Sequence, residues 1–123
     1  MNQETQEKTK KVFYETGEKL AVTDPEFVEL IANFSQGEVT EASKLTEKER
    51  MLCILSALLG CQGMGEFRNM LHASLDAGLS PEAVKEVIYQ ATAYLGIGRT
   101  HNFLTVKSEA SGLRKTIQLC NSL

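Results

Sequence analysis

The residues best suited to chemistry lie together in one short stretch of this 123-residue chain. Residues 60–72, GCQGMGEFRNMLH, contain a thiol at Cys61, a carboxylate at Glu66, a guanidinium at Arg68 and an imidazole at His72. An imidazole exchanges protons near neutral pH and suits general acid–base catalysis, whereas a thiolate suits redox chemistry. The stretch is therefore an acid–base site, a thiol site, or only the polar start of a helix.

The spacing of the three cysteines disfavours a dithiol mechanism. Redox pairs usually follow a C-x-x-C pattern, but Cys53 and Cys61 are eight residues apart and Cys120 lies near the chain end. We expect Cys53 to be buried in a leucine-rich helix, and Cys61, after Gly60 at a helix end, to be accessible. No pair of His or Cys residues has zinc-site spacing, so we expect no bound metal.

His72 lies at the edge between the apolar and the polar side of its predicted helix. At about 100° per residue, Arg68, His72 and Asp76 form one stripe beside the apolar stripe of Phe67 and Leu71. An imidazole at this edge can reach a pocket, or it can simply bond to a neighbouring residue. Arg68 can likewise meet a substrate carboxylate or pair with a carboxylate such as that of Asp76.

Two glutamates are candidates for orienting the imidazole. Glu66 precedes His72 by six residues, so on a regular helix their side chains point about 120° apart. Gly63 and Gly65 allow an irregular first turn that brings the two closer. Otherwise Glu66 only complements the helix N-terminus. Glu38, from another segment, is the second candidate.

Helix-start and helix-stop signals divide the chain into six predicted helices. TDPE (23–26) and LSPE (79–82) place a capping side chain before proline, and TEKE (46–49) has the pattern of a capping box. Gly78 and Gly96 occupy expected C-terminal caps. Apolar residues recur at helical spacing, and no stretch alternates as a strand would. The predicted helices are residues 3–20, 24–35, 46–60, 64–77, 81–95 and 99–120, with residues 36–45 as the one longer connection.

Composition indicates a single globular domain, residues 1–123. Hydrophobic residues make up 42% and charged residues 24%, and the net charge of −3 gives no reason to expect nucleic acid or an anionic membrane as a partner. The longest apolar run, residues 51–60, is too short for a membrane span, and the odd number of cysteines suggests the cytoplasm. The central helices are apolar around much of their girth. We therefore expect an all-α homo-oligomer.

An ordered set of residues over positions 34–98 carries a resemblance to a known family. The segment FSQGEV (34–39) has the pattern F-x-x-G-x-V, and further matches are Leu45, Arg50, His72, Gly78, Ser80, Glu86, Gln90, Tyr94 and Gly96. The chain thereby resembles the carboxymuconolactone decarboxylase-like family. This resemblance implies an alkylhydroperoxidase D-like helical bundle that assembles as trimers or hexamers, with a pocket between helices near a subunit interface.

The resemblance also separates two kinds of chemistry. The branch similar to 4-carboxymuconolactone decarboxylase removes CO₂ from a lactone acid without a cofactor. The branch similar to alkylhydroperoxidase D uses the two thiols of C-x-x-C-x-x-x-H. Here Gly65 and Arg68 stand seven and four residues before His72, where that motif has its cysteines. The resemblance therefore implies the branch without redox thiols.

The resulting hypothesis is a cofactor-independent lyase acting on a small lactone or carboxylic acid. We expect His72 and Glu66 to be catalytic, and Arg68, Cys61 and Glu38 to contact the substrate. Two alternatives stay open. One is a peroxidase-like antioxidant that uses Cys61 as its thiol, and the other is a non-enzymatic helical oligomer that binds a small acid.

Overall fold

The computed structural model describes the backbone of residues 16–122 and the side chains of residues 20–109. All regular structure in this range is helical, which confirms the all-α prediction. Most of the first predicted helix, from residue 3, lies outside the described residues, and so does the side chain of Cys120. The chain divides into two compact units, Met1–Thr46 and Glu47–Leu123, and each is described by itself.

The first unit consists of α2 (Thr16–Thr23) followed by α3 (Pro25–Ala32), η1 (Asn33–Glu38) and α4 (Val39–Ala42), the last three forming one continuous helix. α2 and α3 are separated by Asp24 alone, whose φ of −138° and ψ of 61° interrupt the helical backbone. Pro25 then starts α3 at a position where its missing N–H is not needed. The predicted helix start is confirmed, although the Asp24 side chain makes no capping hydrogen bond.

The predicted connection over residues 36–45 is wrong, because the helix continues through η1 and α4. η1 is a π-helical segment in which the Val39 N–H donates to the Phe34 carbonyl, five residues earlier. Such a segment takes one extra residue into a helix without ending it. Gly37, inside the predicted connection, lies within this segment. Only residues 43–46 separate α4 from the next helix.

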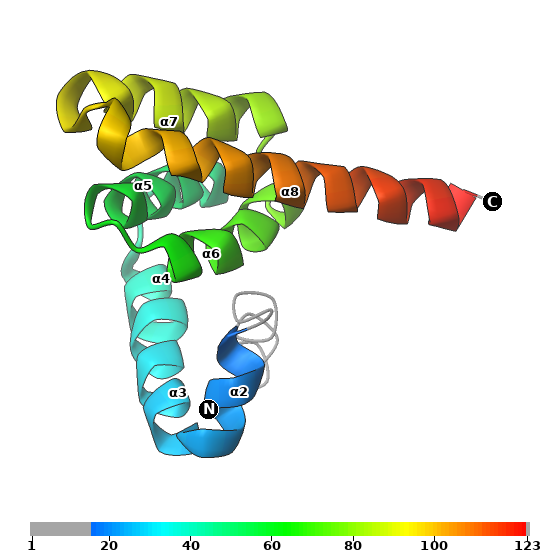
Figure 1. Cartoon of the computed structure of the whole chain (residues 1–123). Helices are drawn as coiled ribbons and strands as arrows, with labels where there is room; N and C mark the ends of the chain where they lie inside the picture. The colour runs from blue at the N-terminus through cyan, green and yellow to red at the C-terminus, as the bar shows by residue number, and fades with distance from the viewer. Residues whose placement is uncertain (1–15, 123) are drawn as a thin grey trace. The chain divides into compact units, whose positions relative to one another are not determined.

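The second unit consists of α5 (Glu47–Gly60), α6 (Met64–Asp76), α7 (Pro81–Leu95) and α8 (Ile97–Ser122). α5 packs against α6 and α7, while α8 runs alongside both α7 and α6 (Figure 1). None of the helices in the described range is long and apolar enough to cross a membrane. These four helices agree with the predicted ones to within two residues at each end.

The core of the second unit is built from one apolar face of each helix. Phe67 on α6 is fully buried, and its ring meets Phe103 of α8 edge to face, with centroids 4.9 Å apart and an interplanar angle of 88°. The other buried apolar residues of these helices are Met51, Leu55, Leu59, Met70, Leu71, Ala73, Val84, Ile88 and Val106. Burial of these side chains is the main stabilising contribution that fixes α6 in place.

The caps that the sequence predicts between α6 and α7 are present. Gly78 has a φ of +99°, and its N–H donates to the Leu75 carbonyl, while the Leu79 N–H donates to the Ser74 carbonyl. This pair of bonds is the Schellman arrangement, which favours glycine at the left-handed position. The Ser80 Oγ then accepts a hydrogen bond from the Ala83 N–H at 3.1 Å and caps α7.

Candidate active site

The turn between α5 and α6 sets where the histidine-bearing helix begins. Gln62 adopts a φ of +63°, and it is the one non-glycine residue with positive φ in the described range. Its N–H donates to the Leu59 carbonyl at 3.1 Å, and the Gly63 N–H donates to the Leu58 carbonyl at 2.8 Å. The turn therefore has the same cap geometry as the one at Gly78, but with glutamine in the left-handed position.

The side-chain hydrogen bonds of Gln62 explain why a glutamine occupies this left-handed position. Its Nε2 donates to the Leu59 carbonyl at 2.8 Å and to the Arg99 carbonyl in the first turn of α8 at 3.1 Å. One amide thus links the end of α5 to the start of α8, directly ahead of α6. The sequence carries no signal for this role, because the acceptor at Arg99 lies 37 residues away.

Two substitutions of Gln62 distinguish the stability that its side-chain hydrogen bonds contribute from the cost of its positive φ. Gln62→Ala loses both bonds and keeps a β-carbon in the left-handed region, so we expect it to lower the free energy of unfolding by about 1–2 kcal/mol. Gln62→Gly loses the same bonds but removes the strain. We expect it to be about 1 kcal/mol more stable than the alanine variant in urea denaturation. An alanine variant as stable as the glycine variant would contradict a strained turn.

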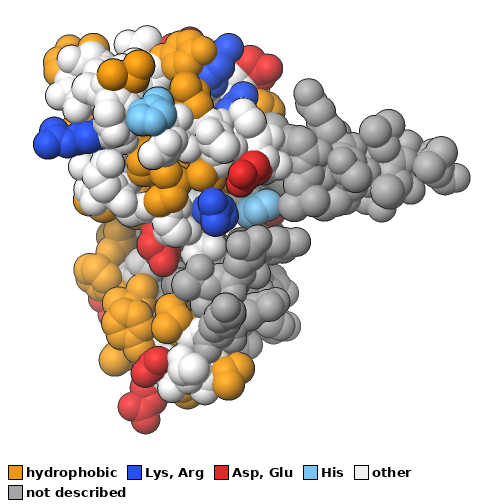
Figure 2. Space-filling view, viewed as in Figure 1, with side chains coloured by type: hydrophobic (Ala, Val, Ile, Leu, Met, Phe, Trp, Pro, Cys, Tyr) orange, Lys and Arg blue, Asp and Glu red, His pale blue; other side chains and the backbone are white. Residues whose placement is uncertain are grey.

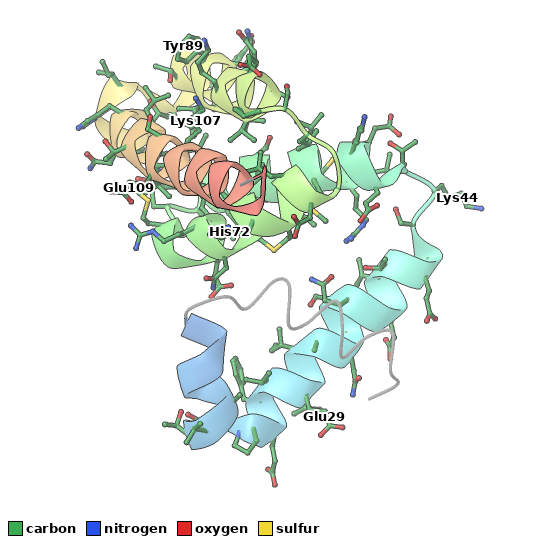
Figure 3. The ribbon with its side chains drawn as sticks, turned by 90° about the vertical axis from the view of Figure 1, so that its right-hand side faces the viewer. Glu29, Lys44, His72, Tyr89, Lys107 and Glu109 are labelled. Atoms are coloured by element: carbon green, nitrogen blue, oxygen red, sulfur yellow. The ribbon has the colours of Figure 1, made fainter. Side chains whose placement is uncertain are left out.

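His72 lies on α6, half-buried, on the flank that the helical spacing predicts. Figure 3 shows it on α6 next to α8, which carries Glu109. Phe67 and Leu71, on the neighbouring stripe, are buried and hold α6 against the core. The imidazole is therefore carried by a well-packed helix, and His72 is partly exposed to solvent.

Arg68, one turn before His72, pairs with a residue that the sequence analysis did not consider. Its Nη2 lies 3.9 Å from the Glu109 Oε2 of α8, and the two side chains are 44% and 64% exposed. An ion pair this exposed contributes at most about 1 kcal/mol. The guanidinium can consequently turn toward a ligand carboxylate at little cost.

Glu66 lies exposed in the first turn of α6, where it complements the positive end of the helix. α6 is regular from Met64 onward, so the irregular first turn expected from Gly63 and Gly65 is not found. On this regular helix Glu66 and His72 point about 120° apart. The role of Glu66 as an orienting or catalytic acid stays a prediction. Glu38, exposed at the end of η1, belongs to the first unit, and its role stays a prediction too.

The two cysteines whose side chains the structure describes are both unbridged and exposed. The expectation that Cys53 is buried is wrong, because the core face of α5 is formed by Met51, Leu55 and Leu59 and Cys53 lies off that face. Cys61 follows α5, and its Sγ lies 3.5 Å from the Leu58 carbonyl, to which the thiol can donate. Its exposure agrees with the expectation, and its contact with a substrate stays a prediction.

Asn69 is a site candidate that the sequence analysis missed. It lies between Arg68 and Met70 on α6 and is 1% exposed, yet its Nδ2 has no hydrogen-bond partner among the residues that the structure describes. On the sequence alone it falls on the polar side of the helix and looks like one more surface residue. Its burial became visible only in the folded chain.

The described residues contain no group of three or more His, Cys, Asp or Glu residues placed to hold a metal ion. A search of the curated proteins finds no match to the chain. The sequence pattern of the carboxymuconolactone decarboxylase family, in contrast, matches residues 25–106. This match covers well over half of the chain, extends across parts of both units and includes α6 with His72. The chain therefore belongs to the carboxymuconolactone decarboxylase family, as the resemblance of its sequence implied.

Proposed function

We propose that this protein catalyses cofactor-independent proton-transfer chemistry on a small lactone acid, with decarboxylation as the reaction. The observation that supports this most is a half-buried imidazole, His72, on a well-packed helix inside the segment that matches the family. Arg68, one helical turn away and 44% exposed, is suited to hold a substrate carboxylate. His72 supplies the proton that such a reaction consumes.

The proposed decarboxylation requires the protein only to position the substrate and to supply one proton. When the C–C bond to the carboxylate breaks, CO₂ leaves and the electron pair remains on carbon. A lactone carbonyl conjugated with that carbon accepts the pair as an enolate, so the substrate provides its own electron sink. Protonated His72 then donates to the carbon that lost CO₂ and regains a proton from water. The sum is R–COO⁻ + H⁺ → R–H + CO₂.

We also propose that the protein works as a homo-oligomer, a trimer or a hexamer. Phe27, Leu30 and Phe34 follow helical spacing on α3 and η1, and they are 55%, 69% and 60% exposed. Figure 2 shows hydrophobic side chains gathered on the surface of these helices. An apolar stripe of this kind is typical of a surface that a partner subunit covers.

The proposal is tested with the purified full chain and 4-carboxymuconolactone. We expect release of CO₂ together with a product that, in D₂O, carries one deuterium at the carbon that lost CO₂. Light scattering on the same preparation should give three or six times the mass of one chain. Absence of CO₂ release from this and related lactone acids would contradict the proposed reaction.

Thiol chemistry gives a different result in the same preparation. If the protein consumes hydrogen peroxide, and if this activity is lost in Cys61→Ser while no lactone acid is converted, the exposed Cys61 thiol is the reactive group. We expect no peroxide consumption that depends on Cys61, because Gly65 and Arg68 replace the thiol pair of the redox branch. Cys53→Ser, at another exposed thiol, is the matched control.

A further inference from the structure

Arg68 and Glu109 form an ion pair between two helices of the second unit. The Arg68 Nη2 lies 3.9 Å from the Glu109 Oε2, and the two side chains are 44% and 64% exposed. Opposite charges attract at this distance, but it is longer than a hydrogen bond. Arg68 is therefore already engaged by a carboxylate of the protein itself, loosely and in contact with solvent.

The packing of α6 against α8 fixes where the two charges stand. Phe67 and Phe103 meet edge to face across this contact, and Val106, about one turn after Phe103, is also buried. Arg68 directly follows Phe67 on α6. Glu109 lies about one turn after Val106, on the flank of the buried stripe of α8. Figure 3 shows Glu109 on α8 near α6, so core residues of both helices keep the two charges close to each other.

A ligand carboxylate can form a better pair with Arg68 than Glu109 does. A free carboxylate can approach the planar guanidinium in its own plane and accept two parallel N–H bonds of about 2.7–2.9 Å. The Glu109 carboxylate is tethered to α8 and stands 3.9 Å away. Because an exposed ion pair of this kind is weak, a ligand that makes the two short bonds displaces Glu109.

We propose that Glu109 is an internal competitor for Arg68, which the substrate carboxylate displaces on binding. This assignment rests on the proposed function, in which Arg68 holds that carboxylate. In the empty site Glu109 pairs with the guanidinium. When a ligand acid leaves, Glu109 pairs with Arg68 again, so the guanidinium always has a carboxylate partner. The affinity for acids is thereby kept moderate, which favours release of any acid that binds Arg68.

This competition acts on charged ligands only. A neutral ester has no carboxylate to displace Glu109, so its affinity does not depend on the ion pair. The effect also depends on salt, because both charges are exposed and the screening length falls to about 3 Å in 1 M salt. Glu109 therefore lowers the affinity for acids and leaves that for neutral molecules unchanged.

Glu109→Gln tests this role because glutamine has the same size and no charge. The probe is muconate, a dicarboxylate, titrated into the purified full chain and followed by ¹⁵N–¹H NMR. We expect its Kd to fall about two- to fivefold, the change that corresponds to the loss of one exposed ion pair. The gain should disappear in 1 M NaCl. Dimethyl muconate, the neutral ester of the same skeleton, should gain no affinity.

Two further variants separate competition at Arg68 from a general change of charge. Glu82→Gln removes another exposed carboxylate, on α7, and is the matched control that should leave the muconate Kd unchanged. Arg68→Gln should weaken muconate binding. Glu109→Gln added to Arg68→Gln should change the Kd less than 1.5-fold, because no guanidinium is left to compete for, which is roughly the limit for independent sites.

Turnover gives a second readout of the same competition. The KM for 4-carboxymuconolactone should fall about two- to fivefold in Glu109→Gln while kcat stays at the wild-type value, since the competition acts on binding and not on the chemical step. A lowered kcat with an unchanged KM would overturn the inference.

The binding measurements distinguish a failure of this inference from a failure of the proposed reaction. A tighter muconate Kd in Glu109→Gln supports the inference even if the protein releases no CO₂ from any lactone acid. An unchanged muconate Kd, or no muconate binding at all, overturns the inference, and release of CO₂ by the same protein would leave the proposed reaction standing. Equal tightening in Glu82→Gln, or in the Arg68→Gln background, also overturns it.

Discussion

Phe67→Ala is expected to lower the free energy of unfolding by about 3–5 kcal/mol. Phe67 is fully buried in α6, and its ring meets Phe103 of α8 edge to face at 4.9 Å. Truncation removes the transfer free energy of the ring and leaves a cavity that the helices cannot fill completely. A domain of this size is stable by only about 5–15 kcal/mol, so the loss is a large part of the total.

Urea denaturation followed by circular dichroism measures this effect, and a double-mutant cycle with Phe103→Ala isolates the ring pair. We expect a coupling energy of about 0.5–1.5 kcal/mol between the two rings. Phe67→Leu is the matched variant, because it preserves most of the volume and should cost much less than Phe67→Ala. A cost below about 1.5 kcal/mol for Phe67→Ala would contradict the packing of α6 through this residue.

The helices of the second unit could be predicted from sequence because their ends are fixed by local chemistry. Ser80 caps α7 through a neighbour three residues away. At the end of α6, the Gly78 N–H bonds to the carbonyl three residues earlier, and the Leu79 N–H bonds to the carbonyl five residues earlier. Such bonds connect residues close in sequence, so residue type and spacing are enough to indicate them. The family resemblance rests largely on the same region, and the match to residues 25–106 confirms it.

The predicted connection over residues 36–45 is wrong because part of it adopts π-helical backbone, which helix propensities do not describe. The predicted connection contains Gly37, and glycine in a helix costs about 1 kcal/mol. The π-helical segment η1 accommodates it, and the helix continues to Ala42. Propensities reflect regular α-helix, and they contain no term for a segment that closes its hydrogen bonds over five residues.

The candidate site was predicted in part, and the missing parts depend on long-range structure. Helical spacing placed His72 correctly at the edge of the buried face of α6. It could not find the Glu109 partner of Arg68, 41 residues later, or the bond from Gln62 to the Arg99 carbonyl. Asn69 was missed because helical spacing placed it on the polar side of α6, whereas in the folded chain it is 1% exposed.

His72→Gln is expected to lower kcat for 4-carboxymuconolactone about 10²- to 10⁴-fold, the usual contribution of a general acid–base group. Glutamine keeps a polar side chain of similar reach on the half-buried flank of α6, but it cannot exchange a proton near neutral pH. The fold should be retained, because the core face of α6 is formed by other residues. Circular dichroism and urea denaturation check this before any rate is compared.

His101→Gln is the matched control, because it changes the other histidine of the chain in the same way. His101 is exposed on α8, and its Nδ1 lies 2.8 Å from the Ile97 carbonyl of its own helix. We expect its kcat to remain at the wild-type value. A His72→Gln variant with wild-type kcat would remove His72 from the mechanism. Equal losses of kcat in His72→Gln and His101→Gln would show that the effect is not specific to α6.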